Sequence, residues 1–224
     1  MKKRIVLGLF CLLSIFPLMA GQADEIIRSA SNLVGTPYRW GGISPSGFDC
    51  SGLLYYLYHR VVASFPRTSA DQSRTGSFVA QADLVPGDLV FYATGSSRTT
   101  ITHVALYIGS NTVIQAVSEG PQTGVVITDM DERYWRNRYV TSRRVLAKTD
   151  SSELPVVAKE KVIDNKGNEK TVVSIGTRRF TLMSWEEWFA AEQEAFEAKQ
   201  DRESRVLDED MSDFEKWKQQ NSPG

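Results

Sequence analysis

Cys50 has the sequence surroundings of a nucleophile. Residues 53–61 show the apolar spacing of a helix, and Asp49 is a suitable N-cap, so Cys50 falls in the first turn. The backbone N–H groups and the dipole at a helix start lower the pKa of a thiol and favour the thiolate. Glycines before the helix allow a tight chain approach. The alternative is a buried cysteine that acts as a small apolar side chain.

A thiolate catalyst needs a base, and the sequence offers only two histidines. His59 lies nine residues beyond Cys50 on the same predicted helix. That spacing puts it about 180° around the axis and about 13 Å along it, too far to reach the sulfur. His103 begins the segment 103–108, in which Val104, Leu106 and Ile108 alternate with the other side chains as in a half-buried strand. His103 is therefore the predicted base.

Gln115 is the candidate partner for the second nitrogen of the His103 ring. A Gly-Ser-Asn turn after Ile108 predicts a hairpin into a second strand. If the loop has three residues, Ile108 lies opposite Thr112, and Gln115 then shares the face of His103. A two-residue loop would put Gln115 on the other face. The alternative for Gln115 is an exposed strand glutamine without a role.

The first 23 residues have the order of a secretory signal peptide, with a basic start, an apolar run over 5–20 and then an abrupt change to polar residues. The run is shorter than the roughly 20 residues that span a bilayer, so we expect removal after Ala20 or Ala23 and no stable membrane anchor. Cys11 would be lost with it. The exported chain, in a periplasm or outside the cell, would keep Cys50 as a lone thiol with no disulfide partner.

The composition of the 224 residues is that of a soluble protein, with 42% hydrophobic and 24% charged residues. Lys and Arg (26) nearly balance Asp and Glu (27), giving a net charge of −1, so no overall field favours nucleic acid as a partner. Two cysteines and two histidines are too few for a zinc ribbon or a disulfide scaffold. We expect no metal and no cofactor.

The residues around these candidates resemble the NlpC family of bacterial cell-wall cysteine peptidases, which have a papain-like fold. The resemblance spans about residues 25–146, with the matching stretches in the family's order. These stretches are Gly35–Gly42, Gly47–Leu53, Pro66–Gln72, Pro86–Tyr92, His103–Gly109 and a last one that joins Tyr134-Trp135 to Arg138-Tyr139-Val140.

The resemblance implies an α+β fold in which an antiparallel sheet carries the Cys50 helix on one face. By position, Cys50 matches the nucleophile, His103 the base and Gln115 the orienting residue, where the family more often has histidine. Tyr38 matches a tyrosine that helps to hold the oxyanion together with the backbone N–H of Cys50. Asp49 and Ser51 match residues that line the substrate cleft. Tyr38 is otherwise a core aromatic residue.

The same resemblance implies hydrolysis of amide bonds in peptidoglycan stem peptides, without metal or cofactor. The favoured bond joins γ-D-glutamate to the diamino acid, and the D,D cross-link comes next. Two other functions stay open: a catalytically weak protein that binds wall peptides or a partner through the same cleft, and an amidase or acyltransferase that uses the same trio.

The C-terminal third of the chain lies outside the resemblance. Residues 150–224 hold 17 acidic and 11 basic residues, a net charge of −6, which leaves +5 for residues 1–149. Two apolar segments, 156–163 and 171–175, flank a polar turn and predict a hairpin that either extends the catalytic sheet or stands apart.

An acidic amphipathic helix is expected after the hairpin. Ser184 and Glu187 form a capping-box pattern, and Ser212 with Glu215 predicts a second, short helix. The first helix would dock on its own domain by its aromatic residues, bind a protein partner, or cover the Cys50 cleft as a lid. The predicted organisation is a signal peptide at 1–23, a catalytic domain at 24–148, a hairpin and linker at 149–183 and the helical tail at 184–224.

Overall fold

The computed structural model describes residues 21–146 and 156–221. Its centre is a six-stranded antiparallel sheet with the strand order β3-β8-β4-β5-β6-β7. The α+β fold expected from the sequence is thus present, and consecutive strands β4 to β7 lie side by side. The strands are β3 (Ser77–Phe78), β4 (Leu89–Tyr92), β5 (His103–Gly109), β6 (Thr112–Val117), β7 (Gly124–Asp129) and β8 (Tyr139–Arg144).

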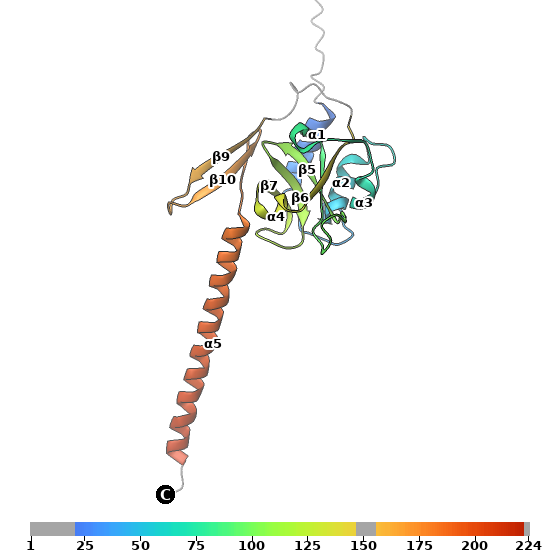
Figure 1. Cartoon of the computed structure of the whole chain (residues 1–224). Helices are drawn as coiled ribbons and strands as arrows, with labels where there is room; N and C mark the ends of the chain where they lie inside the picture. The colour runs from blue at the N-terminus through green and yellow to red at the C-terminus, as the bar shows by residue number, and fades with distance from the viewer. Residues whose placement is uncertain (1–20, 147–155, 222–224) are drawn as a thin grey trace, which may run out of the picture.

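Helix α2 packs against β5 and β6 on one face of this sheet, and α1 packs against α2 (Figure 1). The alternation of faces predicted for β5 is confirmed, but the strand is buried on both faces and not half-buried: Leu106 and Ile108 pack with the α2 residues in the larger core, and Ala105 is buried in the smaller core on the other face. The remaining elements of this part are α1 (Gln22–Leu33), β1 (Ile43–Ser44), β2 (Gly47–Phe48), α2 (Cys50–Tyr58), α3 (Ser69–Gln72), the 3₁₀ helix η1 (Gln81–Asp83) and α4 (Arg133–Arg136).

The start of α2 is fixed by its cap and by glycine. Asp49 is the N-cap, and its Oδ1 accepts a hydrogen bond from the backbone N–H of Gly52 at 2.7 Å. A Cβ on Gly52 would overlap the backbone carbonyl oxygen of Gly42, so the helix can approach the preceding loop this closely only with glycine there. Cys50 is consequently the first residue of the helix, as predicted.

The turn between β5 and β6 differs from the predicted three-residue loop, yet the predicted register holds. Ser110 and Asn111 both have positive φ, 50° and 57°, which makes a two-residue turn. Leu106 pairs with Ile114, but Gly109 pairs with Thr112, because a bulge shifts the register next to the turn. The extra residue in the bulge restores the pairing that a three-residue loop would give, so Gln115 lies on the His103 face.

The predicted hairpin is part of a separate three-stranded sheet with the order β11-β10-β9. Strands β9 (Val157–Ile163) and β10 (Glu169–Ile175) match the two apolar segments, whereas β11 (Arg178–Thr181) was not predicted. Val173 and Ile175 of β10, with Leu182 just after β11, are buried in the larger core and so pack this sheet on the part of the chain that holds the six-stranded sheet. Lys159 pairs with Asp129 at the end of β7.

Helix α5 (Trp185–Asn221) begins at the predicted capping box. The backbone N–H of Ser184 donates to Glu187 Oε2 and the N–H of Glu187 donates to Ser184 Oγ, each at 3.1 Å. The prediction of a second helix at Ser212 is wrong: α5 continues through that position, because no glycine or proline interrupts residues 185–221. Figure 1 shows α5 projecting as a single long rod from the folded body.

The expected signal peptide falls almost wholly on residues 1–20, outside the described residues, as does the first part of the predicted linker at 149–155. Its last residues are different: Gln22 and Ala23 already belong to the first turn of α1, and Ala23 is buried. Within the described ranges, no helix is long and apolar enough to cross a membrane.

Candidate active site

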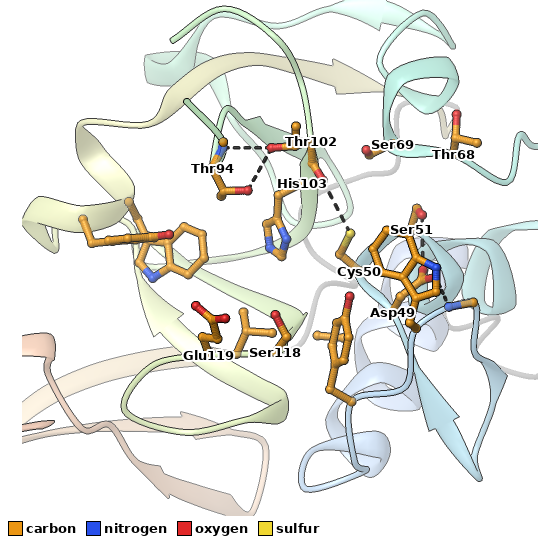
Figure 2. Close-up of a pocket in the computed structure, with 18 of the residues that line it drawn as sticks. Asp49, Cys50, Ser51, Thr68, Ser69, Thr94, Thr102, His103, Ser118 and Glu119 are labelled. Atoms are coloured by element: carbon orange, nitrogen blue, oxygen red, sulfur yellow. Dashed lines mark hydrogen bonds between the residues drawn. The ribbon is translucent and has the colours of Figure 1, made fainter. Parts of the chain in front are cut away.

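A cleft of about 730 Å³ lies where the start of α2 meets the start of β5. Cys50, His103, Tyr38, Asp49 and Ser51 all line it. Figure 2 shows the sulfur of Cys50 and the imidazole of His103 facing the same space. Gln115 lies behind His103, fully buried. The structure therefore brings together every site residue that the sequence singled out, from one helix, two strands and the loop before α2.

Cys50 is not activated by the helix start in the way the sequence suggested. Burial raises the pKa of its thiol, and the neighbouring carboxylate of Asp49 raises it further. Hydrogen bonds with the backbone of Val104 and Ser51 lower the pKa but do not outweigh these effects. The expectation of a lowered thiol pKa is corrected here, because it considered the helix dipole without the desolvation of the sulfur or the charge of the cap.

His103 is held in one orientation by Gln115. The ring Nε2 lies 2.7 Å from Gln115 Oε1, and Gln115 Nε2 donates to Thr128 Oγ1, also at 2.7 Å. The amide oxygen thus accepts from Nε2–H, which leaves Nδ1 unprotonated and free to accept a proton. Burial lowers the pKa of His103 to about 4, although the hydrogen bond that the ring donates to Gln115 acts in the opposite direction. Tyr92 and Trp135 pack beside the ring.

The resting pair at neutral pH is consequently a neutral thiol and a neutral imidazole. A neutral imidazole with a free Nδ1 can accept the thiol proton as the sulfur attacks, and it can return that proton to a leaving amine. This arrangement supports acyl transfer by general-base catalysis, without a preformed ion pair.

Arg67 is a charged residue of the cleft that the sequence analysis missed. Its guanidinium donates to Asp49 Oδ1 at 3.0 Å and to Oδ2 at 2.5 Å, and also to Ser51 Oγ at 2.9 Å. Burial disfavours the charged form of Asp49, but these bonds and the N–H groups of Gly52 and Gly41 hold its pKa below the usual range. Arg67 lies in the matching stretch Pro66–Gln72, but nothing in that stretch indicated that its side chain contacts Asp49.

Tyr38 forms an isolated bridge with Phe48 and lines the cleft beside Cys50. Burial raises the pKa of its phenol, and the nearby Cys50 and Asp49 raise it further, so the hydroxyl stays protonated and can donate. No group of three or more His, Cys, Asp or Glu side chains in the described parts of the chain could hold a metal ion.

At the end of the cleft away from Asp49 and Arg67 lie residues that were not among the predicted site residues. Glu119, Tyr134 and Trp135 line it, and so does Trp185 from the first turn of α5. Docking by its aromatic residues was one of the three roles expected for the tail, and Trp185 docks by stacking on Tyr134 with 4.4 Å between ring centroids. Phe189 and Phe196, farther along α5, are exposed.

Comparison with known proteins gives the family. Residues 35–144 match the model of the NlpC/P60 family. The chain is 38% identical over 138 residues to the Gamma-DL-glutamyl hydrolase of Bacillus subtilis, covering 60% of this chain and 33% of that protein. It is 44% identical over 119 residues to the Murein DD-endopeptidase MepH of Escherichia coli, covering 50% of this chain and 42% of that protein.

A solved structure of an NlpC/P60 family protein from Bacillus cereus is 34% identical with a TM-score of 0.52, over 56% of this chain and 40% of that one. The matches thus leave more than half the length of these relatives uncovered. The chain thus contains an NlpC/P60 family domain at residues 35–144.

Proposed function

We propose that this protein is a thiol endopeptidase that hydrolyses amide bonds in peptidoglycan stem peptides. The observation that carries the proposal is the Cys50 sulfur facing a His103 ring whose far nitrogen is bound by Gln115. The relatives support the substrate class, since one is named a glutamyl hydrolase and another a murein endopeptidase.

In the proposed mechanism, the Cys50 sulfur attacks the scissile carbonyl carbon while His103 Nδ1 takes the thiol proton. The resulting oxyanion accepts hydrogen bonds from the backbone N–H of Cys50 and the hydroxyl of Tyr38. The C–N bond then breaks, and the imidazolium gives its proton to the leaving amine. Water, deprotonated by His103, attacks the thioester and releases the acid and the free thiol. Gln115 keeps Nδ1 directed at the sulfur throughout these steps.

The favoured bond is the amide between γ-D-glutamate and the diamino acid, followed by the D,D cross-link. The first bond type agrees with the name of another similar protein, the Gamma-D-glutamyl-L-lysine dipeptidyl-peptidase of Bacillus subtilis, and the second with the name of the murein DD-endopeptidase. We further propose that the chain is exported and acts in a periplasm or outside the cell without a stable membrane anchor, which is where such a substrate occurs.

A second candidate is a catalytically weak protein that binds wall peptides through this cleft. The raised pKa of Cys50 and the lowered pKa of His103 favour it, since a neutral pair attacks more slowly than a thiolate. An amidase or acyltransferase would use the same three residues with a different leaving group or acceptor.

Mass analysis of defined peptidoglycan fragments tests the proposal. Wild type and the Cys50→Ala variant are incubated with the fragments, and His59→Ala serves as the matched control, because His59 is exposed and does not line the cleft. New products from wild type and His59→Ala, absent with Cys50→Ala, are expected, and their masses name the bond. Binding of the fragments without any product would instead support the second candidate.

A further inference from the structure

The cleft has two ends of different chemistry. At one end, Asp49 and Arg67 neutralise each other. At the other, Glu119 contributes a carboxylate that makes no ion pair or hydrogen bond with the described residues, and no basic side chain of that part of the chain lines the cleft apart from Arg67. Glu119 is therefore the unbalanced charge of the cleft, and a cation is the complementary ligand.

Trp185 closes the cleft beside Glu119, and its position is fixed from several sides. Its ring stacks on Tyr134 at an interplanar angle of 18°, and the guanidinium of Arg138 also lies over the Tyr134 ring at 3.7 Å from its centroid. A Cβ on Gly120, the residue after Glu119, would come within 2.8 Å of the Trp185 ring. The loop after β6 and the first turn of α5 thus fit against each other with no room for a larger residue.

Hydrogen bonds also fix the start of α5, next to the Trp185 ring. Besides the capping box, Glu187 accepts a hydrogen bond from Lys170 of β10 at 2.6 Å. Trp185 is accordingly a preorganised wall of the cleft, supplied by a segment outside the family domain at 35–144.

The position of His103 indicates which part of a substrate would bind at the Glu119 and Trp185 end of the cleft. His103 must give its proton to the leaving amine, so the residue that carries this amine lies on the His103 side of Cys50. In Figure 2 the carboxylate of Glu119 lies on the same side of Cys50 as His103 and farther from Cys50. The leaving residue therefore extends toward Glu119 and Trp185.

We propose that Glu119 and Trp185 form a subsite for the side-chain ammonium group of the residue on the leaving side of the scissile amide. A carboxylate provides charge pairing, and an indole attracts a cation through its ring electrons. The inference rests on the proposed function, and it identifies the leaving residue as a diamino acid whose second amine is free. The C-terminal extension is then part of substrate recognition.

The test uses two synthetic stem peptides that differ only in a free or an acetylated side-chain amine on the leaving residue. Wild type is expected to cleave the free-amine peptide with a kcat/KM higher by about two- to thirtyfold. Glu119→Gln and Trp185→Ala should lower this ratio toward one, mainly through KM. Trp185→Phe should keep most of it, because it retains an aromatic face.

Glu194→Gln and Phe196→Ala, both on the exposed surface of α5, are matched controls that should keep the wild-type ratio. Equal cleavage of both peptides by wild type, or an unchanged ratio in Glu119→Gln, overturns the subsite. Calorimetric binding of both peptides to Cys50→Ala measures the preference for the free amine without catalysis. Absence of cleavage with a retained binding preference would refute the proposed function alone, and absence of that preference would refute the subsite.

Discussion

The hydrogen bond from His103 to Gln115 decides which ring nitrogen is available to Cys50. Both side chains are buried, and the amide N–H of Gln115 donates a second hydrogen bond to Thr128. A neutral amide fixes the tautomer but adds no negative charge, so it does little to stabilise an imidazolium. Hydrogen bonds therefore fix the orientation of the His103 ring, and the resting pair of Cys50 and His103 carries no net charge.

Replacing Gln115 by alanine tests this orienting role. The change leaves Nε2 of His103 without an acceptor in a buried site, so we expect the free energy of unfolding to fall by about 1–3 kcal/mol. Turnover should fall by about 10²-fold or more, because the proton acceptor is no longer directed at the sulfur. Gln115→His, which keeps a ring nitrogen as acceptor, should retain much more activity. Urea unfolding and kcat measure the two effects, and unchanged turnover in the alanine variant would contradict the role.

The pH dependence of Cys50 alkylation tests the neutral resting pair. Because the pKa of His103 is lowered to about 4, the ring is uncharged above about pH 5 and provides no cation to stabilise a thiolate. The raised pKa of Cys50 then makes its alkylation rate keep rising with pH beyond the range of an ordinary thiol. Asp49→Asn should shift the curve to lower pH by removing a negative charge. A rate that is already at its plateau near pH 6 would show a thiolate–imidazolium pair instead.

For single residues, the sequence predicted those site residues whose local pattern in the chain indicates their role. Cys50 sits behind a capping residue, and His103 sits in an alternating strand. Arg67, Glu119 and Trp185 could not be found in this way, since each reaches the cleft from a different part of the chain. The pKa of Cys50 was predicted in the wrong direction because burial, which depends on the whole packed structure, outweighs the local helix start.

Among the elements, α2 shows how closely the helix that carries Cys50 depends on the loop before it. Asp49 caps the helix, also accepts from the backbone N–H of Gly41 at 2.9 Å, and pairs with Arg67. One carboxylate therefore ties together the helix start, the preceding loop and the segment before α3. These ties set the position of the sulfur more narrowly than the helix alone would.

Gly52→Ala tests this close approach. The added methyl would overlap the carbonyl oxygen of Gly42, which is backbone and cannot move independently. We expect the free energy of unfolding to fall by about 2 kcal/mol or more. Gly95→Ala is the matched control, because the nearest atom to its Cβ would be at 3.8 Å, and its stability should change by less than about 0.5 kcal/mol. Equal urea midpoints for the two variants would contradict this account of α2.

The first turn of α5 meets a cluster of carboxylates, and this gives its docking a pH dependence. Burial, together with the neighbouring carboxylates of Asp129, Glu186 and Glu187, raises the pKa of Glu132 to about 8. Asp129 is paired with Lys159 and Glu187 with Lys170, so Glu132 and Glu186 carry the less compensated charge. A carboxyl with a raised pKa stabilises the folded form below its unfolded pKa of 4.5, and this contribution is lost as pH rises through about 8.

Glu132→Gln should remove that dependence. We expect wild type to lose stability relative to the variant between about pH 5 and pH 9, by about 1 kcal/mol after allowance for solvent screening. Hydrogen exchange of residues 184–192, measured at both pH values, follows the docking directly. Parallel pH profiles for the two proteins would show that the carboxylates do not oppose docking.

The β5–β6 turn and the tail show where element prediction succeeds and where it fails. The register of Gln115 was correct although the loop length was wrong, because the bulge at Gly109 compensates for the shorter turn. The capping box correctly marked the start of α5, since both hydrogen bonds are local. The same pattern at Ser212 wrongly predicted a new helix start, because no glycine or proline ends α5 before that position. Strand β11 was not predicted because its Arg178-Arg179 start lacks an apolar pattern.

For the whole molecule, the C-terminal extension joins the body by two different contacts. Its small sheet contributes Val173, Ile175 and Leu182 to the larger core, and Arg178 donates to the carbonyl of Ser31 at the end of α1. The first turn of α5 covers one end of the cleft, while the rest of the helix projects away from the body (Figure 1). Of the three roles expected for the tail, docking describes the first turn, and partner binding by the projecting part stays a prediction.

Three truncations separate these contacts. A chain that ends at Leu146 loses the buried side chains of the small sheet, so its free energy of unfolding should fall by several kcal/mol, at about 1.5–3 kcal/mol for each large apolar residue. A chain that ends at Met183 keeps that sheet in the core but loses Trp185. It should stay folded and lose the preference for a free side-chain amine.

A chain that ends at Gln200 keeps both contacts and should match the full-length protein in stability and in substrate preference. Urea unfolding and the two-peptide assay, applied to all three chains, distinguish a structural sheet from a recognition turn and from a projecting helix. Higher activity in the Met183 form toward both peptides would make the first turn an inhibitory cover. Loss of preference in the Gln200 form would instead place part of the recognition on the projecting helix, where no described side chain reaches the cleft.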